Sequence, residues 1–327
     1  MTDGVVAVAP AAGRAVVVVR PGALTTVQDA GRPGHAHLGV PRSGALDPGA
    51  AALANRLVGN GPSAAVLETT LTGCALRPRA PMTAAVTGAA CTVRVDGRPA
   101  AWGAAVSVPA GGVLDVGPAV HGVRSYVALA GGVSVDPVLG SRSTDLLSGL
   151  GPPPLATGTV LPLGAPAALH ARVDTAPQPG PPGELVLPVA WGPRHHWCTA
   201  AALATLTTGR YRVSPASNRI GLRTEGPPLE RRIRDELPSE GMVLGAVQVP
   251  PDGRPVVFLA DHPTTGGYPV VAVVREPALA AAAQAAPGTP VRFVVAGRNA
   301  EGVGSGSSGS SSEAGAGPPP ATAHDAG

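Results

Sequence analysis

The sequence predicts a mainly β protein with a few short helices. Short runs rich in Val and Leu recur along the chain, and Gly and Pro gather between them, which is typical of strands joined by tight turns. Helical segments do not alternate with these runs, so the pattern favours a sandwich or barrel over a parallel α/β sheet. A hydrophobic content of 44% is sufficient for real cores.

With 327 residues, the chain is longer than one typical domain, and we expect two modules. A Pro-rich stretch at 174–184 predicts a linker between an N-terminal β-rich module at 14–173 and a C-terminal β-barrel module at 185–298. Residues 1–13 are expected to be a disordered leader. Gly, Ser, Pro and Ala dominate 299–327, which predicts a disordered tail.

In the first module, the pattern predicts strands at 15–20, 66–71, 84–87, 92–95, 106–108, 113–116 and 123–129. It also predicts a helix at 48–58. Asp47 supplies a side-chain cap there, Pro48 suits the first helical position, and Gly59 follows the last turn. In the second module, we expect a strand at 185–190 and helices at 199–206 and 277–286.

Residue types that are missing exclude several functions. The chain has no lysine, so all 24 basic residues are arginine. A Walker-type phosphate loop, a Schiff-base enzyme and a biotin carrier each need a lysine, and we therefore expect no covalent biotin on this chain. The net charge of +3 is spread among acidic residues, which argues against nucleic-acid binding.

The three cysteines are far apart and lack the spacing of a metal site. No apolar run approaches the length of a membrane span, and the first residues lack the pattern of a signal peptide. We expect a cytoplasmic protein without a metal or membrane function.

A polar loop follows a predicted hairpin in the second module. Runs at 243–249 and 255–260 are joined by turn residues, and a further strand begins at Val270. Between them, Gly266 and Gly267 can expose backbone N–H groups to an anionic oxygen, beside the residues Asp261, Thr264, Thr265 and Tyr268. The alternative is a wide turn that Asp261 caps.

Other polar groups allow two interpretations each. Asn218, Arg219 and Arg223 place an amide and two guanidinium groups close together, which suits carboxylate binding or an ordinary solvated turn. Asp29 and Arg32 lie in a polar stretch, either near a site or paired in a surface loop. Glu68 interrupts an apolar strand, and residues 142–145 follow Gly140; both fit either a cleft or the surface.

Nine motifs occur along the chain in an order that resembles the biotin-dependent carboxyltransferase A-subunit family, which includes the 5-oxoprolinase C subunit, KipA-type and allophanate hydrolase subunit 2-like proteins. They are TTVQDAGRPG from Thr25, SGALD from Ser43, LANRLVGN from Leu53, LETTLTG from Leu67, RSYVALAGG from Arg124, GSRSTDL from Gly140, SNRIGLR from Ser217, SEGMVLGAVQVPPDG from Ser239 and TTGGYP from Thr264. One departure is Pro263, preceded by His262, where the family usually has Gln.

This resemblance implies two cyclophilin-like β-barrel modules and a role as the C subunit of a 5-oxoprolinase. Such a complex opens 5-oxoproline to L-glutamate with ATP, and its partners for this chain would be the 5-oxoprolinase subunits A and B, of which the second is the smaller and KipI-like. ATP would be bound by the complex, on a chain that the sequence does not identify. The alternatives are the carboxyltransferase subunit of a biotin-dependent urea carboxylase and a KipA-type regulatory binder of a kinase-inhibitor protein.

Lactam opening requires a cation for the substrate carboxylate, donors for the developing oxyanion and a base. Our hypothesis assigns the first to Arg219 or Arg223, the second to Gly266 and Gly267, and the third to Asp261. Further residues would orient the substrate, namely Asn218, Gln248, Thr264, Thr265 and Tyr268. A second tier comprises Asp29, Arg32 and Glu68.

Overall fold

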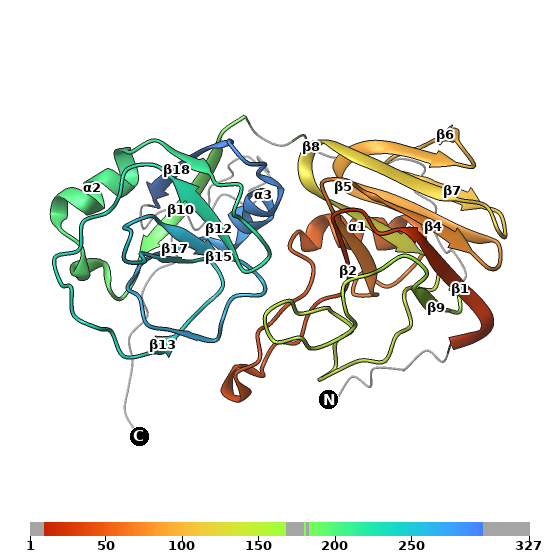
Figure 1. Ribbon diagram of the computed structural model, residues 1–327, viewed down its shortest axis with the longest axis horizontal. Coiled ribbons are helices and arrows are strands. Elements are labelled where there is room, and N and C mark those ends of the chain that lie inside the picture. The colour runs from red at the N-terminus through yellow and green to blue at the C-terminus, as the bar shows by residue number, and fades with distance from the viewer. Residues whose placement is uncertain (1–9, 168–179, 181–182, 297–327) are drawn as a thin grey trace, which may run out of the picture. The chain divides into compact units, whose positions relative to one another are not determined.

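The computed structural model describes residues 10–167, 180 and 183–296 (Figure 1). Residues 1–9 of the predicted leader, most of the predicted linker and the whole of the predicted tail lie outside these residues. The first strand, β1 (Pro10–Arg20), begins inside the predicted leader and extends the strand expected at 15–20. Residues up to Val295 belong to one compact unit.

The first half of the chain forms a nine-stranded sheet. The main path of hydrogen-bonded neighbours is β2-β3-β8-β4-β1-β9, and β5 adds β6 and β7 beside β8. The strands after β1 are β2 (Leu24–Gln28), β3 (Val66–Thr70), β4 (Cys74–Pro78), β5 (Met82–Val95), β6 (Arg98–Ala100), β7 (Ala105–Val108), β8 (Leu114–Leu129) and β9 (Val160–Gly164).

β5 and β8 are each one long strand, where the sequence predicted two short ones. They pair with each other along most of their length, with shifts of register between Gly88 and Val93. Gly88 and Gly122 have positive φ angles of 82° and 86°, which a residue with a Cβ rarely adopts. These positions bend the paired strands as bulges instead of ending them.

Helix α1 (Pro48–Leu57) covers one face of this sheet. Asp47 Oδ1 accepts a hydrogen bond from Ala50 N at 3.0 Å, which confirms the predicted cap. Ala54 and Leu57 of the helix are buried against Tyr126 of β8. A larger apolar core, with members such as Val16, Leu67, Leu76, Leu114 and Val127, fills the other side.

The second half of the chain forms a closed barrel in the order β10-β17-β14-β15-β12-β11-β18. Its strands are β10 (Leu185–Trp191), β11 (Tyr211–Val213), β12 (Gly221–Glu225), β14 (Ala246–Gln248), β15 (Val256–Phe258), β17 (Val270–Val274) and β18 (Pro290–Val295). Val247 faces Val257 in antiparallel register, which confirms the predicted hairpin. Leu187, Val257 and Phe293 are among the residues of the barrel core.

Short elements complete the second half. Helix α2 (Ala200–Thr208) and helix α3 (Leu279–Gln284) lie near the helices expected at 199–206 and 277–286. Strands β13 (Glu240–Gly241) and β16 (Thr265–Gly266) form a separate two-stranded sheet. Turns of 3-10 helix occur at η1 (Ala36–Leu38), η2 (His195–Trp197) and η3 (Glu276–Ala278).

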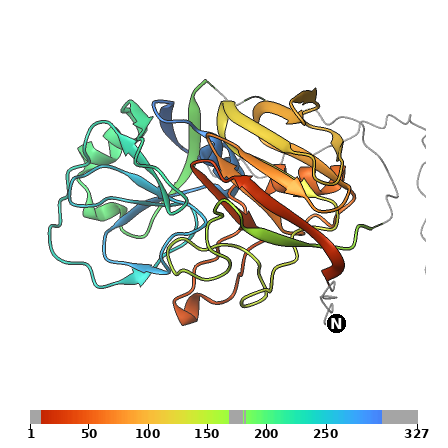
Figure 2. The same ribbon diagram turned by 45° about the vertical axis from the view of Figure 1, so that its right-hand side comes forward.

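The expected fold class is confirmed: the chain is mainly β, with one closed barrel, one half-barrel sheet and a few short helices. The strands of the two sheets gather into two groups in both views (Figures 1 and 2). Among the residues that the structure describes, no helix is long and apolar enough to cross a membrane.

Candidate functional site

A buried arginine joins the two sheets. Arg219, just before β12, is 1% exposed, and its Nε and Nη2 donate to the two carboxylate oxygens of Asp261, each at 2.9 Å. Its Nη1 lies 2.5 Å from Oε1 of Glu68, which belongs to β3 of the other sheet. Nη2 also donates to the carbonyl oxygen of Gly44 at 2.7 Å. One guanidinium therefore binds two carboxylates from opposite halves of the chain.

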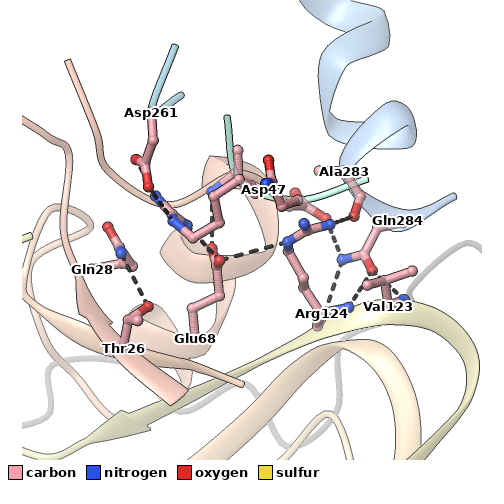
Figure 3. Close-up of polar contacts among 12 residues, drawn as sticks. Thr26, Gln28, Asp47, Glu68, Val123, Arg124, Asp261, Ala283 and Gln284 are labelled. Atoms are coloured by element: carbon pink, nitrogen blue, oxygen red, sulfur yellow. Dashed lines mark hydrogen bonds and ion pairs between the residues drawn. The ribbon is translucent and has the colours of Figure 1, made fainter. Parts of the chain in front are cut away.

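Glu68 is held by further donors on its second oxygen. Oε2 accepts hydrogen bonds from Leu46 N at 3.0 Å and from the hydroxyl of Tyr126 at 2.9 Å. A second arginine, Arg124 on β8, lies with its Nε 3.6 Å from Glu68 Oε1 (Figure 3). Both oxygens of this buried carboxylate thus face polar partners.

The two carboxylates differ in their titration. Burial raises the pKa of Glu68, but the charges of Arg219 and Arg124 and the hydrogen bonds outweigh it, so the pKa lies below its ordinary value. Burial also raises the pKa of Asp261, and Arg219 opposes this only in part, because Asp145 and Glu68 add negative charge nearby. Asp261 is the carboxylate of this cluster that takes up a proton more readily.

Gln284 forms the second connection between the two sheets. Its Oε1 accepts from the backbone N–H groups of Val123 and Arg124, and its Nε2 donates to Arg124 O and to Asp47 Oδ2 at 3.0 Å each (Figure 3). The residue sits at the end of α3, whereas its partners all belong to β8 or to the cap of α1. α3 is thereby fixed to the N-terminal sheet.

Beside this network lie buried polar atoms that have no hydrogen-bond partner. They are Gln28 Oε1, Ser43 Oγ and Thr144 Oγ1. Gln28 Nε2 donates to Thr26 Oγ1 and to Thr144 O, each at 3.0 Å. Ser43 N donates to Ala260 O, directly before Asp261. We call Gln28, Ser43, Thr144, Glu68, Arg219 and Asp261 the junction cluster.

The junction cluster has the chemistry of a binding site for a small polar molecule. Buried polar groups in proteins are nearly always hydrogen-bonded, so a carbonyl and two hydroxyls left over in one region indicate a partner. Gln28 Oε1 can accept only, whereas the hydroxyls can donate or accept. A ligand with an N–H and carbonyl oxygens matches this set.

The structure corrects the roles predicted for Arg219 and Asp261. It brings the two residues together, as the hypothesis required, but it pairs them with each other. Because the Arg219 guanidinium already binds both carboxylates, a substrate carboxylate cannot reach it without displacing one. Asp261 is fully buried in a bidentate pair, so it is not a free base in this arrangement.

Asn218 and Arg223 lie beside the network but do not join it. Asn218 Oδ1 accepts from Ile220 N and Gly221 N, which holds the turn before β12. Asn218 and Arg219 both line a cavity of about 150 Å³. The Arg223 side chain is exposed on β12, as the solvated-turn alternative predicted.

The loop with the paired glycines lies elsewhere. Thr265 and Gly266 pair with β13, Met242 N donates to Thr264 O, and Tyr268 is 43% exposed with its ring 5.5 Å from the guanidinium carbon of Arg231. Gln248, the remaining member of the predicted set, donates to Tyr268 O at 3.3 Å.

Within residues 183–296, no hydrogen bond or ion pair links this loop to Arg219 or to Asp261. The predicted recess that combined Gly266 and Gly267 with the arginine is therefore not formed. Proximity in the chain suggested that Asp261 and the glycines would share one site. The backbone instead turns away after Asp261 to pair with β13.

The second-tier residues also have defined positions. Asp29 accepts hydrogen bonds from Ser141 Oγ and Ser143 Oγ at 2.6 Å each, from Arg142 N at 2.6 Å and from Gly31 N at 2.8 Å, so it clamps two loops together. The surface pair of Asp29 with Arg32, one expected alternative, is not present. Arg32 is 1% exposed and donates to Ser143 O at 2.5 Å and Val138 O at 3.3 Å.

Several residues of the site were not named as candidates from the sequence. Thr26 and Gln28 lie on strand β2 instead of in the expected polar loop. Thr26, Glu68 and Tyr126 are direct cross-strand neighbours in three adjacent strands, so they share one face. A polar row of this kind can be found in a sequence only when the pairing register is known. Arg124 and Gln284 gave no signal of their own.

Comparison with known proteins places this geometry in a family. The 5-oxoprolinase C subunit of Escherichia coli (strain K12) is 37% identical over 288 residues, which cover 85% of this chain and 90% of that protein. Urea amidolyase of Saccharomyces cerevisiae is 31% identical over 307 residues, 86% of this chain but 16% of that protein. The match therefore spans nearly all of the first relative and a small part of the second.

Solved structures agree with the sequence relatives. The crystal structure of TTHA0988 superposes with a TM-score of 0.79 at 38% identity, covering 87% of this chain and 56% of that one. The Kluyveromyces lactis urea amidolyase gives a TM-score of 0.80 at 30% identity over 86% of this chain and 18% of that one. The family model described as carboxyltransferase domain, subdomain A and B, matches residues 38–295, and the chain belongs to this family.

Proposed function

We propose that this chain is the C subunit of an ATP-dependent 5-oxoprolinase complex, which opens the lactam of 5-oxoproline to L-glutamate. The observation that carries the proposal is the extent of the match. This chain covers 90% of the Escherichia coli C subunit and 87% of its Haemophilus influenzae counterpart, which is 32% identical. It corresponds to only 16% of the yeast urea amidolyase, in which the matching region is one part of a long chain.

The chemistry of the junction cluster supports a cyclic amide as ligand. The lactam N–H would donate to Gln28 Oε1, and the hydroxyls of Ser43 and Thr144 would donate to its oxygens. Ring opening breaks the C–N bond, adds water to the carbonyl carbon and leaves an amine and a carboxylate. Asp261, whose pKa is raised by burial, would take up or release a proton once a ligand separates it from Arg219.

The proposal assigns the remaining functions to partner chains. The 5-oxoprolinase subunits A and B, the second of them KipI-like, would complete the enzyme, and ATP bound by the complex would activate the lactam oxygen by phosphoryl transfer. The 56% coverage of TTHA0988 supports a partner, because in that protein a further region is joined to the part that matches this chain. With no lysine in the 327 residues, a biotin carrier would also be a separate chain.

Co-expression of the three proposed subunits tests the function. We expect ATP-dependent release of glutamate from 5-oxoproline, and no release when any one of the three is omitted. Omission of ATP is the control. Absence of turnover by the complete, folded complex would contradict the proposal.

The alternative with specific support is the carboxyltransferase subunit of a biotin-dependent urea carboxylase. Its support is the TM-score of 0.80 to the Kluyveromyces lactis urea amidolyase. The same co-expression system discriminates the two functions when a biotinylated carrier protein and urea replace 5-oxoproline. Carboxylation of urea without glutamate release would favour this alternative.

A further inference from the structure

Arg32 is a buried arginine whose charge is not neutralised by a carboxylate. It is 1% exposed, and its Nη1 has no hydrogen-bond partner. Among the residues that the structure describes, Arg32 forms no ion pair. The acid nearest in sequence, Asp29, has its oxygens occupied by Ser141, Ser143 and two backbone N–H groups.

This arrangement differs from that of the equally buried Arg219. Arg219 contacts two carboxylates, whereas Arg32 contacts only the carbonyl oxygens of Ser143 and Val138. A buried charge without a counter-charge is strongly unfavourable, so proteins keep such groups where a ligand completes the pair. The unpaired Nη1 thus indicates a site for an anionic group from outside the chain.

The unpaired Nη1 belongs to the same region as the other unpartnered atoms. Arg32 Nη2 donates to Ser143 O at 2.5 Å, and the next residue is Thr144, whose Oγ1 has no partner. Gln28 Nε2 donates to Thr144 O, while its Oε1 has no partner. On the other side, a Cβ at Gly31 would come within 2.7 Å of Ser43 O. Short contacts and neighbouring peptide bonds thus connect all four residues.

We propose that Arg32 binds the carboxylate of the substrate, while Gln28, Ser43 and Thr144 contact its amide group. The proposal rests on the function inferred above and makes it more specific: the ligand is a small cyclic amide that carries a carboxylate. It also transfers the carboxylate-binding role from Arg219, which is occupied, to Arg32. Leu147, three residues after Thr144, is 45% exposed, so this part of the cluster lies close to the surface.

The test compares two ligands that differ only in the carboxylate. 5-Oxoproline and 2-pyrrolidinone have the same lactam ring, and the second lacks the acid group. Calorimetry on the assembled three-subunit complex would measure the binding of each to the wild type, to Arg32→Gln and to a control, Arg56→Gln, whose side chain is exposed in α1. We expect Arg32→Gln to weaken 5-oxoproline binding by roughly 10- to 100-fold, since hydrogen bonds to charged groups have this strength.

Binding of 2-pyrrolidinone should change little in Arg32→Gln, and Arg56→Gln should bind both ligands as the wild type does. Equal losses for both ligands, or no loss for 5-oxoproline, would overturn the assignment. If Arg32→Gln does not fold, a crystal structure of the wild-type complex with 5-oxoproline decides. A carboxylate within hydrogen-bond distance of Arg32 would support the assignment, and a carboxylate elsewhere would overturn it.

The results also separate this proposal from the proposed function. Binding that depends on Arg32 without glutamate release would reject the oxoprolinase function and keep the anion site. Turnover with an unchanged KM in Arg32→Gln would reject the anion site and keep the function. No binding of either ligand by the wild type would reject both.

Discussion

The junction cluster and the loop around Gly266 and Gly267 are two polar regions with opposite surroundings. In the first, Arg219, Glu68 and Asp261 are each at most 1% exposed, and their charges pair across the two sheets. In the second, Thr265 and Tyr268 are exposed, and the loop pairs with a two-residue strand. The same kind of residue thus has a different cost and a different use in each place.

The comparison shows why polar residues that are close in sequence do not define the site. Asp261 and Gly266 are separated by a few residues, yet only Asp261 belongs to the junction cluster. Glu68 is far from Arg219 in sequence, and the two are in direct contact. Charges buried at a junction of two sheets depend on one another strongly, whereas exposed groups interact weakly through water.

The largest effect is expected when the shared arginine is removed. Arg219→Met would leave Glu68 and Asp261 buried without their counter-charge, and the free energy of unfolding should fall by about 3–5 kcal/mol. Arg223→Met, in the same segment but exposed, should change it by less than about 0.5 kcal/mol. Urea denaturation of both variants measures the difference. Equal effects would mean that burial of the network is not what stabilises the junction.

A smaller effect is expected at the second connection between the sheets. Gln284→Ala would leave the amides of Val123 and Arg124 and the Asp47 carboxylate without a partner, and we expect a loss of about 1–3 kcal/mol. Thr208→Ala at the exposed end of α2 is the matched control. A loss no larger than that of the control would show that water replaces Gln284 fully.

The pH dependence of stability provides a test at His262, which lies between the two regions in the sequence. Burial lowers the pKa of His262 below its ordinary 6.5, although Pro263 O and Asp261 oppose this. The unfolded chain therefore binds a proton first as the pH falls below about 6.5, and stability decreases there. The slope contributed by one such proton is at most about 1.4 kcal/mol per pH unit. His262→Gln should lose this share, which thermal melts between about pH 7 and 5 would reveal.

The smallest effect is expected in the exposed loop. Tyr268→Ala removes a cation–π contact with Arg231 at an exposed position, which contributes about 0.5–1 kcal/mol. Urea denaturation should show a loss within this range, well below that of Arg219→Met. A loss of several kcal/mol would contradict the view that this loop is a peripheral feature.

Much of the fold could be predicted from local patterns. The cap at Asp47, the hairpin of β14 and β15 and the β-rich character follow from residue types that act over a few positions. The continuity of β5 and β8 could not, because glycines that usually mark turns act there as bulges within paired strands. The strand that contains Thr25 and Gln28 was also missed, since polar residues on a buried face resemble a loop.

The candidate site could be predicted in part. Arg219, Asp261 and Glu68 were each identified as candidates, and they are in contact in the structure. Their mutual pairing was not predictable, because it depends on the packing of two sheets whose residues are far apart in the sequence. The same reason hid Gln284, which reaches from α3 to β8.

The most direct test of the account compares one variant from each region in the assembled complex. Gln28→Leu removes the acceptor that the junction cluster offers to a lactam N–H, whereas Gly267→Ala alters the exposed loop. With 5-oxoproline and ATP, we expect glutamate release to fall at least about 10-fold in Gln28→Leu and to stay near wild type in Gly267→Ala. Full activity of Gln28→Leu together with an inactive, folded Gly267→Ala would contradict the account.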